Sequence, residues 1–382
     1  MKSSDFVRQL PEAGRHLGRP QSLSARLHID VPLVVLLLIL AGSGLVILYS
    51  ASGASLDDVF KQAGRIGVAF AIMFGLAQLD PATYRRWSPW IYLAGIGALV
   101  AVLVVGVGAK GAQRWLQLPG LPRFQPSEFM KLAVPMTVAW YLASRTLPPG
   151  LKHIAIAMAI LGLPVLLVIE QPDLGTAILI AASGLVVLFM AGLSWKWIGG
   201  LAGLIAVGAP IMWFFVMLPY QKQRVLTFLN PEEDPLGSGW NIIQSKTAIG
   251  SGGLSGKGWL SGTQSHLDFL PESHTDFIIA VLAEEFGLLG VSLLLLLYVL
   301  IVARGLYIAS QAQDTYSRLV AGCIAITFFV YVFVNIGMVS GLLPVVGVPL
   351  PMISYGGTSA LTLMAGFGVL MSIHTHKKML TR

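Results

Sequence analysis

Charged residues are scarce in this sequence. Only 11% of its 382 residues are Asp, Glu, Lys or Arg, whereas 55% are hydrophobic, and the mean hydropathy is +0.76. A soluble domain carries roughly 25% charged residues, so this composition excludes a soluble globular protein. Apolar runs of the length that crosses a bilayer as a helix recur along nearly the whole chain. We therefore expect an all-α integral membrane protein without a separate soluble domain.

Cysteine is also nearly absent. The single cysteine, Cys323, lies inside an apolar run. An intramolecular disulfide is therefore excluded, and neither redox chemistry nor a thiol metal site is expected. We expect Cys323 to serve as a small packing residue.

Ten apolar runs predict membrane-spanning helices, each separated from the next by Pro, Gly or charge. The basic lead before the first run is too long for a signal peptide. We therefore expect a cytoplasmic N-terminal tail (1–30), a ten-helix membrane domain (31–373) and a cytoplasmic C-terminal tail (374–382). The predicted spans are 31–50, 62–79, 88–107, 126–143, 153–169, 174–193, 196–218, 277–303, 317–340 and 357–373.

Positive charge sets the predicted orientation. An even number of spans puts both termini on one side of the membrane. With that side cytoplasmic, most of the 25 Lys and Arg residues lie inside, as the positive-inside rule requires. Ten lie outside: Lys61 and Arg65 sit at the second span, and the other eight gather at 110–131 and 222–257. They indicate an anionic ligand on that face, and contact with lipid phosphates is the alternative.

One long extracytoplasmic loop, 219–276, separates the seventh and eighth spans. Loops of this length in compact proteins are usually functional or disordered. Its Gly and Ser residues are interleaved with Trp240, Ile242, Ile243 and Trp259. We therefore expect the loop to pack on the membrane surface.

Two glycine patterns invite interpretation. Gly256 and Lys257 do not form a phosphate-binding loop, because Gly258 stands where Ser or Thr is required. Gly199 and Gly203 have the GxxxG spacing, which predicts helix packing within the bundle ahead of the alternative, a dimer face.

Charges near the spans need partners, since a charge at the centre of a membrane helix costs about 2.5–3.5 kcal/mol or more. Glu128 and Lys131 are three residues apart on one helix face, so a mutual ion pair and a direct ligand role are both open. Asp173 precedes a span and is expected to cap its helix. Glu284 and Glu285 lie inside the eighth span, and we expect their partners among Lys131 and the outer ends of the other helices.

The spacing of the His and Asp residues before the eighth span does not indicate a metal site. The titratable residues before the eighth span match no common zinc spacing; they are His266, Asp268, His274 and Asp276. His374 and His376 stand beside the lysines of the C-terminal tail, and we expect them to be solvated.

The stretch 264–288 passes from a run of His, Asp and Glu directly into an apolar span. The polar loop ends at Asp276 and the helix is predicted to begin at Phe277. A carboxylate therefore stands at the mouth of a membrane helix, which is where chemistry on a lipid-linked substrate would take place.

Five motifs are spread over the chain: KGAQRW (110–115), QPSEFMK (125–131), QPDLGTA (171–177), PESHTDFIIAVLAEEFGLLG (271–290) and NIGMVSGLLPVVGVPLPMISYGGTS (335–359). Together they resemble the motifs of the SEDS family (shape, elongation, division and sporulation), the ten-helix bacterial peptidoglycan glycosyltransferases. The rod-shape, elongation branch is the most similar. The resemblance covers about residues 30–374.

This resemblance implies an enzyme that polymerises lipid II, the undecaprenyl-pyrophosphate-linked disaccharide-pentapeptide. The reaction would take place at the outer face of the bacterial cytoplasmic (inner) membrane during cell elongation. A class B penicillin-binding protein, a single-span transpeptidase, is implied as a partner. Other elongation-machinery membrane proteins and membrane lipids are further partners, and no nucleic acid is expected.

The resemblance also implies site residues. Asp276 matches the catalytic aspartate and is expected to act as the general base on the acceptor 4-hydroxyl; a diphosphate leaving group needs no second acid, unlike in glycosidases. The residues expected at the substrate are Arg114, Trp115, Glu128, Lys131, Asp173 and His274.

The expected roles differ among these residues. The charges of Arg114 and Lys131 suit the pyrophosphate or a carboxylate of the substrate peptide. Trp115 either stacks on a sugar or anchors the chain at the interface. Glu128 and Asp173 are expected to organise the cavity or a divalent cation. No cofactor is firmly predicted: Mg²⁺ or Mn²⁺ fits the chemistry, but the spacing defines no ligand set. The loop 344–359 is expected to form a re-entrant cover over the substrate cavity.

Two other functions stay open. A flippase for the lipid precursor would have repeated halves and midplane charges, whereas this sequence has no convincing repeat and its charges gather at the outer face. A scaffold that recruits a transpeptidase is compatible with catalysis.

Overall fold

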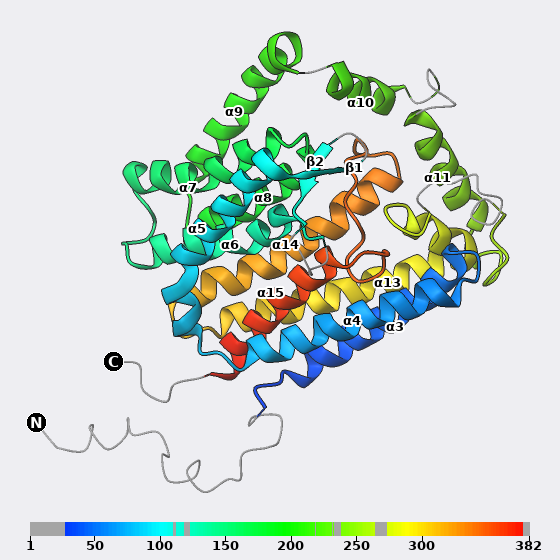
Figure 1. Cartoon of the computed structure of the whole chain (residues 1–382), viewed down its shortest axis with the longest axis horizontal. Coiled ribbons are helices and arrows are strands. Elements are labelled where there is room, and N and C mark those ends of the chain that lie inside the picture. The colour runs from blue at the N-terminus through cyan, green and yellow to red at the C-terminus, as the bar shows by residue number, and fades with distance from the viewer. Residues whose placement is uncertain are drawn as a thin grey trace, which may run out of the picture.

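The computed structural model describes residues 27–109, 112–117, 123–217, 219–230, 232, 238–263 and 273–376. It is mostly helical (Figure 1). In chain order the helices are α3 (Val31–Ala51), α4 (Leu56–Ala77), α5 (Pro81–Val105), α6 (Pro126–Ala143), α7 (Leu151–Ile169), α8 (Leu174–Met190), α9 (Trp195–Ile211), the short π-helix η2 (Met212–Val216), α10 (Pro219–Leu229), α11 (Ser238–Gly252), α13 (Ile278–Ser310), α14 (Thr315–Val339) and α15 (Thr358–Thr375).

The helices confirm a multi-pass membrane protein. Each of the ten predicted spans overlaps one long helix, and η2 continues α9 in the seventh. Seven of these helices are long and apolar enough to cross a membrane within the part of the chain that the structure describes: α3, α4, α5, α7, α13, α14 and α15. Because α6, α8 and α9 fall outside this set, the count of ten crossings stays a prediction.

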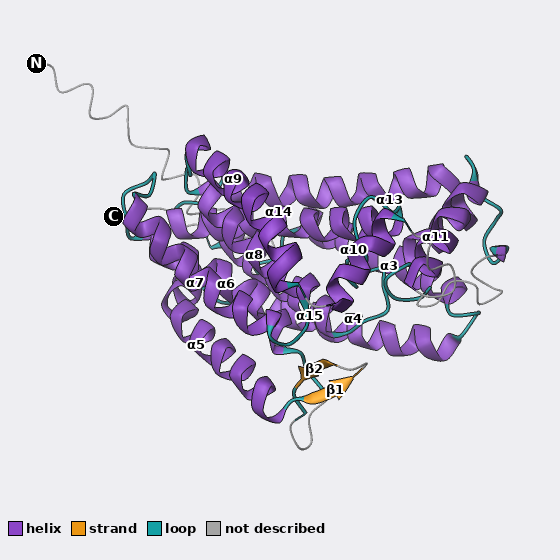
Figure 2. Cartoon of the chain, turned by 90° about the horizontal axis from the view of Figure 1, so that it is seen from above, coloured by secondary structure: helices purple, strands orange, loops and turns teal. Residues whose placement is uncertain are grey.

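A small hairpin departs from the all-α expectation. Strands β1 (Val107–Ala109) and β2 (Ala112–Trp115) pair antiparallel, with Gly108 opposite Gln113. An isolated bridge from Leu116 to Phe124 extends the pairing. Figure 2 shows the hairpin beside the end of α5, outside the layers of helices. It carries the chain from α5 to the start of α6.

Helix α14 packs against α6, α8, α13 and α15. Small residues allow these approaches: a Cβ at Gly322 would overlap Met190 of α8. The thiol of Cys323 is buried and donates to the Ser183 carbonyl at 3.2 Å, which confirms its packing role. The packing predicted for Gly199 and Gly203 is wrong, because both are exposed and a Cβ on either would meet no atom within 4 Å.

The long loop between α9 and α13 packs in part against the other helices. Figure 1 shows α9 projecting beyond the other helices and the chain returning through α10 and α11. Helix α11 packs against α13, Ile242 is buried, and the Ser245 hydroxyl donates to the Val339 carbonyl at 2.8 Å. Ile242 therefore packs within the protein, and the packing of the loop on the membrane surface stays a prediction.

Both ends of the described chain meet at one end of the bundle, which we call the Asp30 end. The rings of His28 and His376 stack with centroids 3.7 Å apart. Asp30 caps α3, and its carboxylate accepts from Arg304 of α13 at 2.7 and 3.1 Å and from His374 of α15 at 2.8 Å. The expectation that His374 and His376 are merely solvated is wrong, because α15 runs to Thr375 and carries His374 into this cluster.

The Asp30 cluster predicts a pH-dependent contribution to stability. Burial alone raises the pKa of Asp30, but the hydrogen bonds from His374, Arg304 and the Leu33 amide outweigh it and hold that pKa well below the usual range. These contacts therefore stabilise the fold above a pH of about 4 and lose their effect as the pH falls toward the lowered pKa.

We expect Asp30→Asn to lower the free energy of unfolding by about 2 kcal/mol at pH 7. The value is moderate because the stranded Arg304 and His374 side chains are partly exposed and can be hydrated. The melting temperatures of the purified variant and of wild type, at pH 7 and pH 3, measure this loss. The difference in melting temperature between them should be smaller at pH 3. Asp57→Asn, which breaks an exposed pair with Lys61, is the control. An equal gap at both pH values would contradict the explanation.

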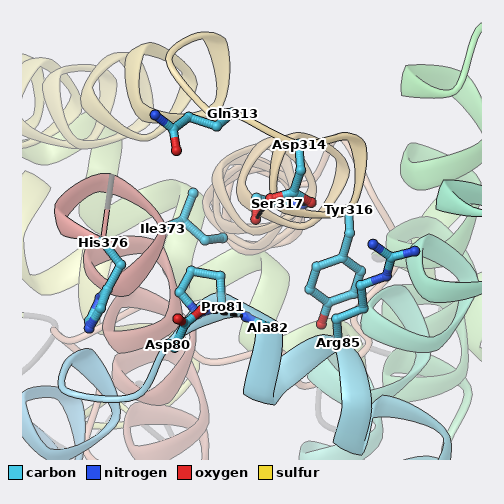
Figure 3. Close-up of a pocket in the computed structure, with 10 residues that line it drawn as sticks. All are labelled: Asp80, Pro81, Ala82, Arg85, Gln313, Asp314, Tyr316, Ser317, Ile373 and His376. Atoms are coloured by element: carbon cyan, nitrogen blue, oxygen red, sulfur yellow. Dashed lines mark hydrogen bonds between the residues drawn. The ribbon is translucent and has the colours of Figure 1, made fainter. Parts of the chain in front are cut away.

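A pocket of about 220 Å³ also lies at the Asp30 end, where the starts of α5 and α14 meet the end of α15 (Figure 3). Its two carboxylates cap their own helices. Asp80 accepts from the Ala82 amide at 2.8 Å, and Asp314 accepts from the Ser317 amide at 3.0 Å. The pocket is thus a junction of capped helix ends, and we assign it no chemistry.

Candidate active site

A cavity of about 340 Å³ contains Asp276 at the other end of the bundle, which we call the Asp276 end. Its wall comes from β2, the start of α8, the end of α10, α11 and the loop before α15. The described residues that line it are Arg114, Asp173, Leu174, Gly175, Thr227, Asn241, Ile242, Asp276, Val345, Val346 and Gly347. Segments distant in sequence thus converge on one carboxylate.

Asp276 lies in the turn 273–277, directly before α13, where the sequence placed it. Three successive carbonyls of this turn accept hydrogen bonds from two other segments. The Tyr355 amide donates to His274 at 2.9 Å, the Ser354 hydroxyl to Thr275 at 2.5 Å, and the Asn335 side chain to Asp276 at 2.9 Å. The backbone at Asp276 is therefore fixed by the end of α14 and by the loop before α15.

Asn335 also ties that loop to the same point, because its Nδ2 donates to the Val348 carbonyl at 2.7 Å. The neighbouring Gly347 has a φ of +72°, and a Cβ there would lie 3.4 Å from the Asp276 carboxylate. Glycine thus allows both the backbone conformation and the close approach. As predicted, the loop 344–359 borders the cavity, through Val345, Val346 and Gly347.

Arg114 enters the cavity from β2. Its guanidinium donates to the carbonyls of Gln171 and Pro172 and lies 3.8 Å from the Asp173 carboxylate. Asp173 caps α8 as expected, and it also accepts from Gln125 at 2.8 Å. These bonds hold one cation and one carboxylate at the cavity wall, with 31% of the Arg114 side chain still exposed.

Glu128 and Lys131 form a separate buried pair, 2.5 Å apart on α6. The Lys131 ammonium also lies over the Tyr331 ring of α14, 5.0 Å from its centroid. Neither side chain is among the described residues that line the Asp276 cavity. Lys131 instead borders a small cavity of about 40 Å³ beside Cys323 and Thr327. The predicted pairing is confirmed, and these contacts favour it over the ligand role.

The two remaining predicted residues also lie outside the described cavity lining. Trp115 ends β2 opposite Val107 and is half-buried. His274 is exposed, and its ring meets Tyr355 edge-on with centroids 5.9 Å apart. Both are neighbours of lining residues in sequence, so their contact with a bound substrate stays a prediction.

The glutamates of the eighth span have partners other than the expected Lys131. Glu284 accepts from Lys257 at 2.7 Å and from the Thr263 amide at 2.8 Å. Glu285 accepts from the Ser50 hydroxyl of α3. Lys131 is not their partner, because Glu128, one helical turn away, already takes its charge. The other expectation agrees with the contact of Glu285, since Ser50 lies near the end of another helix, α3.

The described lining of the cavity does not provide a ready metal site. Its carboxylates are Asp173 and Asp276, and Asp173 is already held by Gln125, the Thr176 amide and Arg114. Within the described residues, no group of three or more His, Cys, Asp and Glu side chains comes together that could hold a metal ion. These described donors do not fit the divalent cation that the chemistry would allow.

Sequence reasoning missed several residues that shape the site. Asn335, Ser354 and Gln125 lie inside the motifs quoted above, and their polarity next to apolar spans was the available signal. Thr227 and Asn241 reach the cavity from α10 and α11, and nothing in their local sequence indicates it.

The fold and the site define a multi-pass helical membrane protein with a charged cavity at one end of its bundle. The chain belongs to the FtsW/RodA/SpoVE family of cell cycle proteins, whose family model matches residues 31–379. It is 55% identical to the peptidoglycan glycosyltransferase MrdB of Escherichia coli over 357 residues, which are 94% of this chain and 96% of that protein.

Solved structures are similar to this chain in fold as well. One of them comes from a study of structural coordination of polymerization and crosslinking by a peptidoglycan synthase complex. It matches with a TM-score of 0.79 and 32% identity, over 90% of this chain and 97% of that one. The rod shape determining protein RodA of Thermus thermophilus matches with a TM-score of 0.69 and 29% identity, over 91% of this chain and 98% of that one.

Proposed function

We propose that this protein is a peptidoglycan glycosyltransferase that polymerises lipid II during cell elongation, with Asp276 as the general base. The observation that carries the proposal is the convergence of Asp276, Arg114 and Asp173 on one cavity at the mouth of α13. The names of the relatives, which are peptidoglycan glycosyltransferases, support the reaction class.

The reaction fits the chemistry of the cavity. The acceptor 4-hydroxyl transfers its proton to the Asp276 carboxylate as its oxygen bonds to the anomeric carbon of the donor. The bond from that carbon to the pyrophosphate breaks, and the lipid pyrophosphate leaves with its electron pair. The Arg114 guanidinium, held by Asp173 and two carbonyls, stabilises the negative charge of the leaving group.

The proposed orientation places the Asp276 end outside the bacterial cytoplasmic membrane and both termini in the cytoplasm. The excess of Lys and Arg at the Asp30 side of the predicted spans supports it. Trp115 and His274 flank the cavity residues and are proposed to contact the substrate from its rim. The Glu128–Lys131 pair is proposed to stabilise α6 against α14.

A class B penicillin-binding protein is the proposed partner, together with other membrane proteins of the elongation machinery. The similarity to a chain from a peptidoglycan synthase complex supports a transpeptidase partner. Such a complex would cross-link the glycan that this protein polymerises.

Purified full-length protein incubated with lipid II tests the proposal. We expect glycan strands, seen as a ladder on a gel, and more product when the cognate transpeptidase is added. The same protein in liposomes, with fluorescent lipid II, tests the flippase alternative. Translocation of the lipid without any polymer, with or without the transpeptidase, would overturn the proposal.

A further inference from the structure

Helix α13 is interrupted close to the candidate site. Gly287 has φ 63° and ψ −162°, which is not helical, although helix continues on both sides. The residues ahead of the break, 278–286, form what we call the leading segment. It begins two residues after Asp276, so its position sets the direction in which the Asp276 turn leaves the bundle.

The chain that follows α11 fills the break. Four backbone hydrogen bonds join residues 253–258 to α13 on both sides of Gly287, with lengths of 2.9–3.1 Å. They run from Lys257 to Glu284, from Gly258 to Glu285, from Leu288 to Gly253 and from Leu289 to Leu254. Backbone groups that an uninterrupted helix would pair internally are thus satisfied by the 253–258 segment.

Glycine makes this contact possible. A Cβ at Gly252 would overlap the Ala283 carbonyl, and a Cβ at Gly256 would overlap the Glu285 carbonyl. Gly256 and Gly287 also have positive φ angles, 79° and 63°. The two backbones therefore approach more closely than side chains would allow.

A charged contact reinforces the backbone bonds. The Glu284 carboxylate is fully buried and accepts from the Lys257 ammonium at 2.7 Å. It also accepts from the amide and the hydroxyl of Thr263, at 2.8 and 3.0 Å. Lys257 donates to the Thr263 hydroxyl as well, at 2.8 Å. The buried Glu284 carboxylate thus ties the leading segment to Lys257 and Thr263, which follow α11.

The part of the chain that contains α11 also reaches the cavity. Helix α11 carries Asn241 and Ile242, which line the cavity, and it ends at Gly252, where the backbone contact begins. One continuous piece of chain, from α11 to residue 258, therefore lines the cavity and binds the leading segment of α13.

We propose that Lys257 and Glu284 are positioning residues for Asp276. Their ion pair locks the leading segment to the segment that follows α11, and this lock holds the carboxylate in the geometry needed for proton transfer. The proposal rests on the proposed function, because it assigns Asp276 the reacting proton. Neither Lys257 nor Glu284 is among the described residues of the cavity wall, so they act on turnover rather than on substrate binding.

Lys257→Met in the full-length protein tests the lock. We expect kcat for lipid II polymerisation to fall about 10-fold, since small misplacements of a catalytic group cost rate steeply, with KM changed less than about twofold. Amide hydrogen exchange over 278–286 should become at least about 10-fold faster. Lys257→Arg should restore both toward wild type. Lys61→Met, which breaks an exposed ion pair at the same end of the bundle, is the matched control and should change neither.

Glu284→Gln and the double variant with Lys257→Met give a second test, which also applies if one single variant folds poorly. The double variant should lose no more kcat than the worse single variant, because both changes break one contact. Unchanged exchange over 278–286 in Lys257→Met, or losses of kcat that add in the double variant, would overturn the proposal. A wild type that makes no glycan would instead overturn the proposed function. The exchange rates would then still report whether Lys257 holds the leading segment.

Discussion

Asp276→Asn is expected to reduce the rate of lipid II polymerisation by at least about 100-fold, the usual contribution of a general base. The amide has nearly the shape of the carboxylate but cannot accept the proton of the acceptor hydroxyl. The backbone bonds that fix this turn, from Asn335, Ser354 and Tyr355, do not involve the replaced side chain. The melting temperature should therefore stay close to that of wild type.

The measurement is the initial rate of glycan formation by purified protein, with the melting temperature measured on the same preparation. Asp57→Asn is the control, because it removes an exposed carboxylate at the same end of the bundle. A folded Asp276→Asn protein that polymerises within about threefold of wild type would remove Asp276 from the chemistry. The base would then have to be sought elsewhere in the cavity.

Much of the fold was predictable because apolar runs define membrane helices. The span 126–143 coincides with α6, since Pro126 at the first position marks its start. Helix α4 begins at Leu56, six residues before the predicted span. Its first turn carries Asp57 and Asp58 behind the Ser55 cap, so hydropathy alone missed a helical start that capping explains.

The candidate site was predictable only in part. Asp276 was found because polar and apolar sequence meet there, and the pairing of Glu128 with Lys131 follows from their spacing on one helix. The partner of Glu284 was not found, because Lys257 lies 27 residues away and reaches it only through the fold of the loop. Contacts of this kind depend on tertiary structure, and no local pattern encodes them.

Lys131→Met is expected to destabilise the protein by about 3–5 kcal/mol, because it leaves the buried Glu128 carboxylate without its counter-charge. The melting temperature and the yield of folded protein should both fall. The double variant Lys131→Met, Glu128→Gln should regain most of that stability, since no unpaired charge is then left between α6 and α14.

The double variant also decides between the two roles that the sequence left open for Lys131. Because neither Lys131 nor Glu128 belongs to the described lining of the Asp276 cavity, we expect the double variant to polymerise lipid II within about threefold of wild type once it is stable. If its melting temperature recovers while KM for lipid II stays at least about 10-fold raised, Lys131 binds the anionic substrate directly. A double variant less stable than Lys131→Met alone would contradict this explanation, because it would show that the Glu128 carboxylate stabilises the fold without Lys131.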